Sequence, residues 1–171
     1  FVNFDWTEWE QRFPSVTDES DQSMVVLGMQ TGHGRSTPLV WKTVTRSALK
    51  DRRNEYEDDL LILLASILPG DVRVTVVADR GFGDSKLYRL LTDEIGFDYL
   101  IRFRGVITVE AESGECRKAS DWVGAGGRMR VLKEARVTAG REPVPVVVCV
   151  RDKAMNDSWC LASSRSDLSG T

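Results

Sequence analysis

The sequence has few of the residues that build metal or disulfide frameworks. Among 171 residues there are one His and three Cys, and Cys116, Cys149 and Cys160 lie far apart with no C-x-x-C pair. A structural zinc site uses closely spaced thiolate and imidazole ligands, so we do not expect one here. We expect the cysteines to be buried, reduced thiols of a cytosolic protein.

Long apolar runs and targeting segments are lacking as well. No stretch approaches the roughly 20 apolar residues of a membrane span, and the opening "FVNFDWTEWE" lacks the basic and apolar regions of a signal peptide. We therefore expect a cytoplasmic protein with no membrane partner, and the abrupt start suggests a fragment. The net charge is −3, but residues 100–153 carry an excess of Lys and Arg. That mild excess is compatible with nucleic-acid binding and equally with an ordinary solvated surface.

Apolar periodicity predicts the order βββαβαβ over residues 1–105. A helix should begin at a capping box of Asn54 and Glu57 and end at Pro69, and a second should begin at Asp84 or Ser85. A polar turn is expected over Thr17–Ser23. The five strands are expected at Val2–Trp6, Met24–Gln30, Leu39–Thr45, Val72–Ala78 and Phe97–Phe103.

After Gly105 the pattern becomes β-rich. We interpret residues 1–105 as an α/β core, 106–157 as a β-rich insertion and 158–171 as a return strand. The insertion should stand apart from the core. It should also expose four basic residues to solvent, namely Arg128, Arg130, Lys133 and Arg136.

Two aspartates stand at positions that need an explanation. Asp79 ends the strand Val72–Ala78, and Asp5 lies in the first strand. If those strands are neighbours, the two carboxylates meet at one edge of the sheet, where a divalent cation would relieve their repulsion. The alternative is that each Asp only caps a turn, and spacing alone favours that alternative.

Four segments, in order, resemble the DDE transposases of the insertion-sequence family called IS-four. They are "FDWTEW", "LPGDVRVTVVADRGFGD", "IGFDYLIRFRG" and "SWCLASS". The resemblance spans nearly the whole chain, and "ADRGFGD" followed by "FDYLIRFRG" is its most specific part. It implies a ribonuclease H-like mixed sheet with a β-rich insertion, and a cut-and-paste transposase that cleaves and joins DNA strands.

The resemblance also implies roles for particular residues. Asp5 and Asp79 match the first two acids of the catalytic triad, which would hold two Mg²⁺ or Mn²⁺ ions. Nothing after Trp159 matches the third acid, and Glu112, Glu115 and Glu142 are poor substitutes, so no third catalytic acid is expected in this chain.

Three further residues match family positions that contact DNA. Arg80 and Arg102 would meet phosphates near the cleaved bond, although each could equally neutralise nearby acids. Trp159 would stack on a flipped base if the mechanism uses hairpins, but a core position is the better interpretation. The other tryptophans are interpreted as packing residues: Trp6, Trp9, Trp41 and Trp122.

Three hypotheses follow. The first is the catalytic core of a bacterial DDE transposase, acting on double-stranded transposon-end and target DNA as a synapsed homodimer. The second is a truncated, inactive remnant that only binds DNA. The third is an unrelated α/β domain without catalysis.

Overall fold

The chain forms two compact units, Phe1–Val74 and Thr75–Thr171. The structure is a computed structural model that describes residues 1–9, 22–82 and 85–167. Those residues form a mixed α/β protein with ten strands and few helices. The expected N-cap at Asp84 and most of the expected turn over Thr17–Ser23 lie outside the described residues, although Gln22 and Ser23 already belong to a strand.

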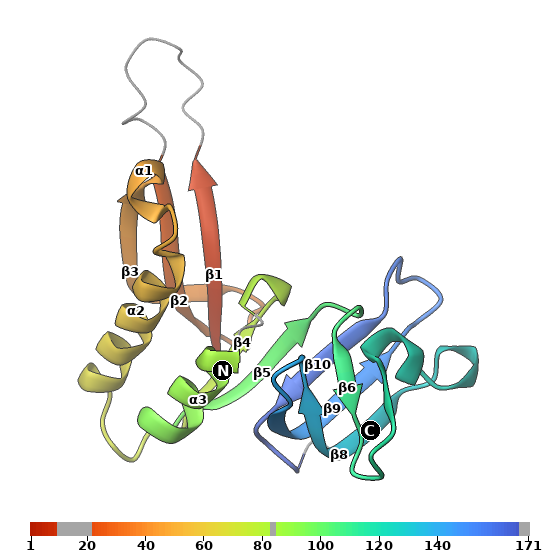
Figure 1. Cartoon of the computed structure of the whole chain (residues 1–171). Helices are drawn as coiled ribbons and strands as arrows, with labels where there is room; N and C mark the ends of the chain where they lie inside the picture. The colour runs from red at the N-terminus through yellow and green to blue at the C-terminus, as the bar shows by residue number, and fades with distance from the viewer. Residues whose placement is uncertain (10–21, 83–84, 168–171) are drawn as a thin grey trace. The chain divides into compact units, whose positions relative to one another are not determined.

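The first unit contains an antiparallel sheet of three strands with two helices (Figure 1). Strand β1 (Val2–Trp9) pairs with β2 (Gln22–Gln30), and β2 pairs with β3 (Ser36–Thr45). The three-strand meander expected from the sequence is therefore confirmed, with longer strands than predicted. A short helix, α1 (Arg46–Leu49), follows β3 and was not predicted.

Helix α2 (Arg53–Ile67) packs against this small sheet, and its start differs from the prediction. The helix begins at Arg53, so Asn54 lies inside the first turn and the predicted capping box is wrong. The carboxylate of Glu57 is instead buried, where it accepts a hydrogen bond of 2.6 Å from the indole Nε1–H of Trp6. Only one side of the apolar segment is covered, since the buried leucines are Leu60, Leu61 and Leu64.

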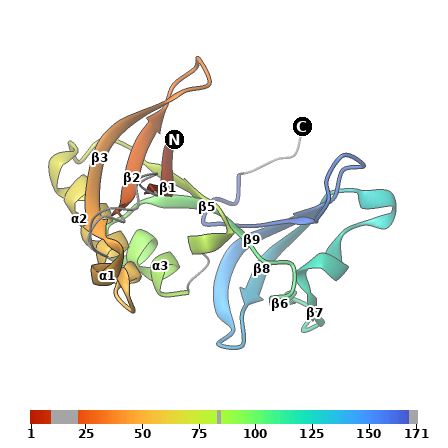
Figure 2. The same cartoon turned by 90° about the horizontal axis from the view of Figure 1, so that it is seen from above.

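The second unit contains a mixed sheet of seven strands in the order β4-β5-β10-β9-β8-β6-β7. Figure 2 labels β5, β9, β8, β6 and β7 of this sheet. Strand β4 (Thr75–Ala78) is parallel to β5 (Asp98–Phe103), as predicted for a crossover connection. Strand β4 is shorter than predicted. It begins at Thr75, and Val72, where the predicted strand began, is exposed. A 3-10 turn (Arg80–Phe82), helix α3 (Ser85–Arg89) and one π-helical turn (Leu90–Glu94) make the crossover.

The crossover packs on the sheet through aromatic and leucine side chains. Leu87 and Leu91 are buried, and the ring of Tyr88 stacks on Tyr99 of β5 with centroids 4.8 Å apart. Gly96 has a φ of +71°, which ends the helical segment as expected of a glycine at this place.

The regular secondary structure of the segment 106–157 is mainly β, as predicted. It contributes β6 (Thr108–Glu110), β7 (Cys116–Lys118), β8 (Arg130–Val137) and β9 (Glu142–Val150), with two 3-10 turns (Ala119–Trp122 and Ala125–Gly127). It does not stand apart from the core strand β5, because β10 (Trp159–Ser163) pairs with both β9 and β5. The interpretation of residues 106–157 as an insertion stays a prediction.

Membrane crossing was not expected from the sequence. In the part of the chain that the structure describes, no helix is both long and apolar enough to span a bilayer.

Candidate functional site

Asp79 and Arg102 meet because of the register between β4 and β5. Ala78 lies beside Ile101 in the parallel ladder, so the next residue of each strand, Asp79 and Arg102, reaches the same level. The guanidinium Nη1 of Arg102 lies 3.3 Å from Oδ1 of Asp79. Asp79, which ends a buried strand, therefore has a cationic partner in the second unit.

Trp159 completes this group from the other neighbour of β5. In the antiparallel ladder of β5 and β10, Leu161 lies opposite Arg102, and Trp159 is two residues earlier on the same face. The guanidinium of Arg102 stands over the Trp159 ring, 5.0 Å from its centroid. Trp159 is 42% exposed, so the interpretation as a core residue is wrong. An accessible indole with a cation on its face is suited to stacking.

A pocket of about 430 Å³ lies beside this group and is rich in arginine. Arg80 and Arg102 line it, as do Arg104 at the end of β5 and Arg151 at the end of β9. Asp157 is the single acid of the lining, and it lies 4.0 Å from the guanidinium of Arg80. We call these four residues, Arg80, Arg102, Arg104 and Arg151, the arginine cluster. Four arginines stand against two acids, Asp157 in the lining and Asp79 beside Arg102. The excess of positive charge favours an anionic ligand, and the fork of donors on each guanidinium suits phosphate.

A second, adjoining pocket of about 400 Å³ extends the cationic surface. It shares Arg80, Phe103 and Arg104 with the first and adds Gly81 and Ser85 from the crossover. Arg80 and Arg104 thus line both pockets, and together the pockets offer space for a ligand larger than a single phosphate.

Asp5 lies in the first unit, on β1. Its side chain is exposed, and its Oδ1 accepts a hydrogen bond of 2.8 Å from the backbone N–H of Trp6. Alternation along β1 points Asp5 and Trp6 to opposite faces of the small sheet. Glu57 bonds the Trp6 side chain, so this buried acid lies on the face away from Asp5. Asp5 and Asp79 belong to different units, and their predicted approach to one another stays a prediction.

The expected Mg²⁺ or Mn²⁺ site can be tested against the donor groups themselves. Among residues 1–9, 22–82 and 85–167, no three His, Cys, Asp or Glu side chains come together as ligands. Asp79 is paired with Arg102, and Asp5 accepts a backbone hydrogen bond. The expected site built on Asp5 and Asp79 alone, with its Mg²⁺ or Mn²⁺ ions, stays a prediction.

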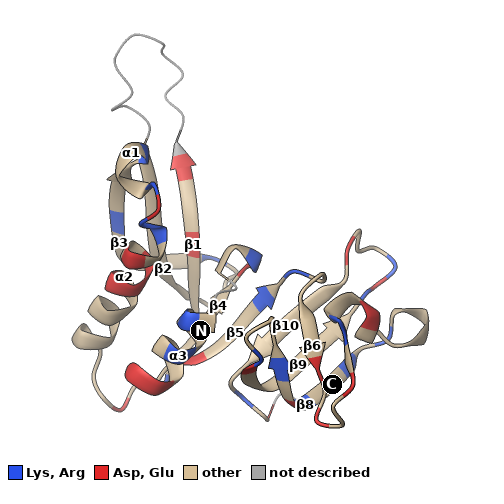
Figure 3. Ribbon diagram, viewed as in Figure 1, with Lys and Arg blue, Asp and Glu red and all other residues tan. Residues whose placement is uncertain are grey.

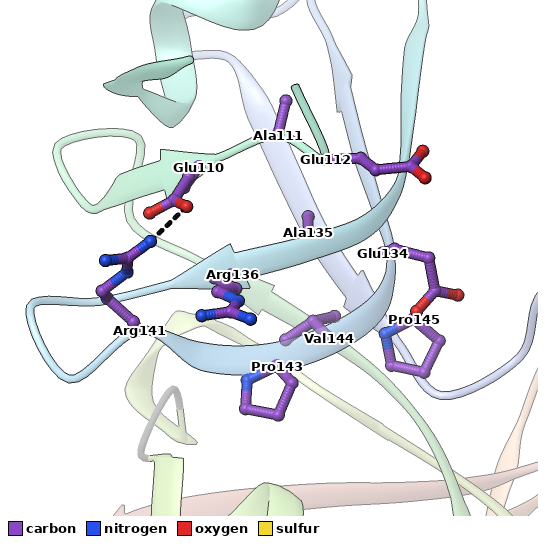
Figure 4. Close-up of a pocket in the computed structure, with 10 residues that line it drawn as sticks. All are labelled: Glu110, Ala111, Glu112, Glu134, Ala135, Arg136, Arg141, Pro143, Val144 and Pro145. Atoms are coloured by element: carbon purple, nitrogen blue, oxygen red, sulfur yellow. Dashed lines mark hydrogen bonds and ion pairs between the residues drawn. The ribbon is translucent and has the colours of Figure 1, made fainter. Parts of the chain in front are cut away.

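The three glutamates considered as substitutes for a third acid lie elsewhere in the second unit. Glu142 pairs with Arg89 at 2.9 Å, and Glu115 pairs with Arg117. Glu112 lines a hollow of about 400 Å³ against β6, β8 and β9 (Figure 4). That hollow has mixed charge, with Glu110 paired to Arg141, and shares no lining residue with the arginine cluster.

Arg104 and Arg151 were missed by sequence reasoning. Arg104 follows Arg102 by two residues in "RFR", and alternation on a strand could have placed both on one face. Arg151 carried no such signal, because only the ladder of β9 and β10 brings the end of β9 to the pocket.

The four basic residues predicted to face solvent in the second unit are all exposed, which confirms that prediction: Arg128, Arg130, Lys133 and Arg136. Figure 3 shows basic positions on both β5 and β8. Trp122 is buried, as predicted for a packing residue, with the guanidinium of Arg130 5.3 Å from its ring centroid. Trp41 is 58% exposed, so its interpretation as a packing residue is wrong.

A comparison of the chain with protein-family models, with curated proteins and with solved structures finds no match to any of them.

Proposed function

We propose that the chain binds DNA through the arginine cluster, as part of the catalytic core of a DDE transposase with a ribonuclease H-like fold. The observation that carries the proposal is that Arg80, Arg102, Arg104 and Arg151 line one pocket next to Asp79 and the exposed ring of Trp159. These groups match the two things a DNA strand offers a protein, phosphate charge and base faces.

The roles of the side chains follow from their contacts. Arg102 keeps one N–H on Asp79 and has further donors for a phosphate oxygen. Arg80 is held only loosely by Asp157, at 4.0 Å, so a phosphate can displace that carboxylate without breaking a close ion pair. Trp159 offers a ring face on which an unpaired base can stack.

The inactive remnant that only binds DNA is the second candidate. Its supporting observation is the missing group of three metal ligands among the described residues. Both candidates need the arginine cluster, and they differ only in whether the chain also cleaves DNA. The order of strands around β4, β5 and β10 is compatible with the ribonuclease H-like assignment, which remains part of the proposal.

The test is DNA binding by the whole chain, measured by fluorescence anisotropy over a range of salt concentrations. Each lost phosphate contact should lower the slope of log K against log salt by about 0.9 for duplex DNA. We expect Arg80→Ala, Arg104→Ala and Arg151→Ala each to reduce the slope in this way. Arg35→Ala, a loss of the same charge in the exposed turn after β2, is the matched control and should leave the slope unchanged.

Two outcomes would contradict the proposal. Equal slopes for the pocket variants and the Arg35 control would show that the binding follows net charge only. Absence of salt-dependent binding to both duplex and single-stranded DNA would remove DNA as the ligand.

A short single-stranded oligonucleotide, whose bases are unpaired, tests the role of Trp159. Trp159→Leu should weaken the binding of this strand more than the binding of the duplex.

A further inference from the structure

Two of the three cysteines, which are separated by ten residues in the sequence, are direct partners in the fold. Cys149 on β9 lies opposite Cys160 on β10 in the antiparallel ladder, and neither side chain is accessible to solvent. Sequence reasoning treated all three as isolated buried thiols. The prediction of buried, reduced thiols is confirmed for Cys149 and Cys160, although their pairing was not foreseen, and it is wrong for Cys116, which is exposed.

The geometry of a directly opposed pair is compatible with a disulfide bond. Opposed residues in antiparallel strands have Cα atoms about 4.5 or 5.5 Å apart, depending on the type of pair, and both values fall in the range found for disulfides. The Cβ atoms of opposed residues lie about 4.5–5.5 Å apart and those of a disulfide about 3.5–4.5 Å, so a shift of roughly 1 Å or less closes the bond.

The chemical state of the two thiols also differs, as a reacting pair requires. A hydrogen bond between the two sulfhydryl groups raises the pKa of Cys149, and burial raises it further. The same hydrogen bond lowers the pKa of Cys160, and the positive charge of Arg102 adds to that effect against the opposing influence of burial. The charge of Arg102 thus favours the thiolate form of Cys160, which we assign as the attacking thiol in the reaction below.

Access to these buried sulfurs comes from the position of the pair in the ladder. The pairing of β9 with β10 ends one residue further on, at Val150 and Trp159. Strand ends open more readily than strand centres, so the loss of one outer pair is enough to admit a small oxidant.

We propose that Cys149 and Cys160 are a reversible thiol–disulfide pair that joins β9 to β10 at the base of the loop carrying Arg151. With hydrogen peroxide as oxidant, the Cys160 thiolate attacks one peroxide oxygen, forms a sulfenic acid and releases hydroxide, which takes up a proton to become water. The Cys149 thiol then loses its proton and attacks the sulfenic sulfur, which expels a second water. Two thiols and one peroxide thus give one disulfide and two waters.

The disulfide would affect the arginine cluster from the opposite face of β10, through the loop that carries Arg151. Alternation along β10 puts Cys160 on the face opposite to Trp159, so the bond forms without blocking the ring. It closes the loop of residues 150–159, which contributes Arg151, Asp157 and Ser158 to the pocket. The inference rests on strand register and thiol contacts and does not depend on the proposed DNA binding.

The experiment uses the full chain with Cys116→Ser, which removes the exposed thiol. The protein is treated with hydrogen peroxide, separated by size, and digested with trypsin without reductant. Trypsin cuts after Arg151 and Lys153, so Cys149 and Cys160 leave on different peptides, and a disulfide is detected as their linkage in the mass spectrum.

We expect linked peptides from monomeric protein, loss of the linkage with dithiothreitol, and an unfolding equilibrium constant lowered about 100-fold by the closed loop of about a dozen residues. Cys149→Ser and Cys160→Ser, each in the Cys116→Ser background, are the controls that cannot form the bond. Two free thiols after treatment, overoxidation without linkage, or linkage found only in dimers would each overturn the proposal.

Discussion

Replacement of Arg102 by Ala should expose how the site is held together, because this one side chain contacts both Asp79 and Trp159. Its loss leaves the Asp79 carboxylate without its cation and removes the charge over the Trp159 ring. We expect a measurable loss of stability in the second unit and a larger loss of DNA affinity. The loss of affinity should be larger because DNA binding also uses the free donors of the guanidinium.

The magnitude follows from how exposed the partners are. The Asp79 side chain is 65% exposed, so its ion pair should contribute about 0.2–1 kcal/mol. The cation–π contact with the partly exposed Trp159 should contribute about 0.5–1 kcal/mol. Arg102→Ala should therefore lower the free energy of unfolding by about 0.7–2 kcal/mol. Arg35→Ala, a surface change, should change it by no more than about 0.5 kcal/mol.

Double-mutant cycles measured by urea unfolding separate the two contacts. The first cycle combines Arg102→Ala with Asp79→Asn, and the second combines it with Trp159→Leu. Each should give a coupling energy of the size stated for its contact, while Arg102→Ala with Arg35→Ala should be additive. Additivity in both of the first two cycles would refute the arrangement in which one guanidinium links Asp79 to Trp159.

Four further predictions concern other parts of the chain. Gly127→Ala should lower the free energy of unfolding by at least about 2 kcal/mol, because φ is +86° and the new Cβ would collide with the carbonyl oxygen of Arg151. Gly126→Ala, at a φ of +70° with open space around it, should lower it by only about 1 kcal/mol. Equal losses for the two variants in urea unfolding would contradict the collision. Burial raises the pKa of Glu57. Between the ordinary Glu pKa of about 4.3 and the raised native pKa, the native state binds more protons than the unfolded chain. The free energy of unfolding therefore falls as pH rises through this range. Glu57→Gln should remove this fall, and a difference from the parent that is constant between pH 4 and 8 would count against it. Joint neutralisation of the exposed basic residues of the second unit should weaken DNA binding at low salt, and unchanged affinity would exclude them from the interface: Arg128, Arg130, Lys133 and Arg136. The 171-residue chain alone should show little Mg²⁺-dependent cleavage of transposon-end DNA, and robust cleavage would mean that a glutamate elsewhere serves as third acid.

The strands were predictable where alternation reports burial directly. In β5 every second residue is buried, and the predicted and observed strands differ by one residue at the start. The start of α2 was mistaken because Asn54 and Glu57 have the spacing of a local cap, while Glu57 in fact accepts hydrogen bonds from Arg53 of the same helix and from Trp6 on β1. A tertiary hydrogen bond of this kind leaves no mark in the local sequence.

The candidate site was predictable in part. Asp79, Arg80, Arg102 and Trp159 were all singled out from the resemblance, and the structure brings all four to one end of β4, β5 and β10. Their mutual contacts were not predictable, because the pairing of Ala78 with Ile101 and of Leu161 with Arg102 is set by the whole sheet. The same limitation hid the cysteine pair.

Strand register is the property on which both inferences depend. Side chains alternate between faces, so a slip of one residue between β5 and β10 would move Arg102 out of reach of Trp159 and turn it to the face of the cysteines. Cys149 opposite Cys160 belongs to the neighbouring ladder of the same strand β10. A disulfide at that position would fix the register of β10 against β9, and β10 is also the strand whose ladder with β5 brings Trp159 to Arg102. The thiol pair and the arginine cluster can thus be physically coupled through a single strand, without any contact between the sulfurs and a ligand in the pocket.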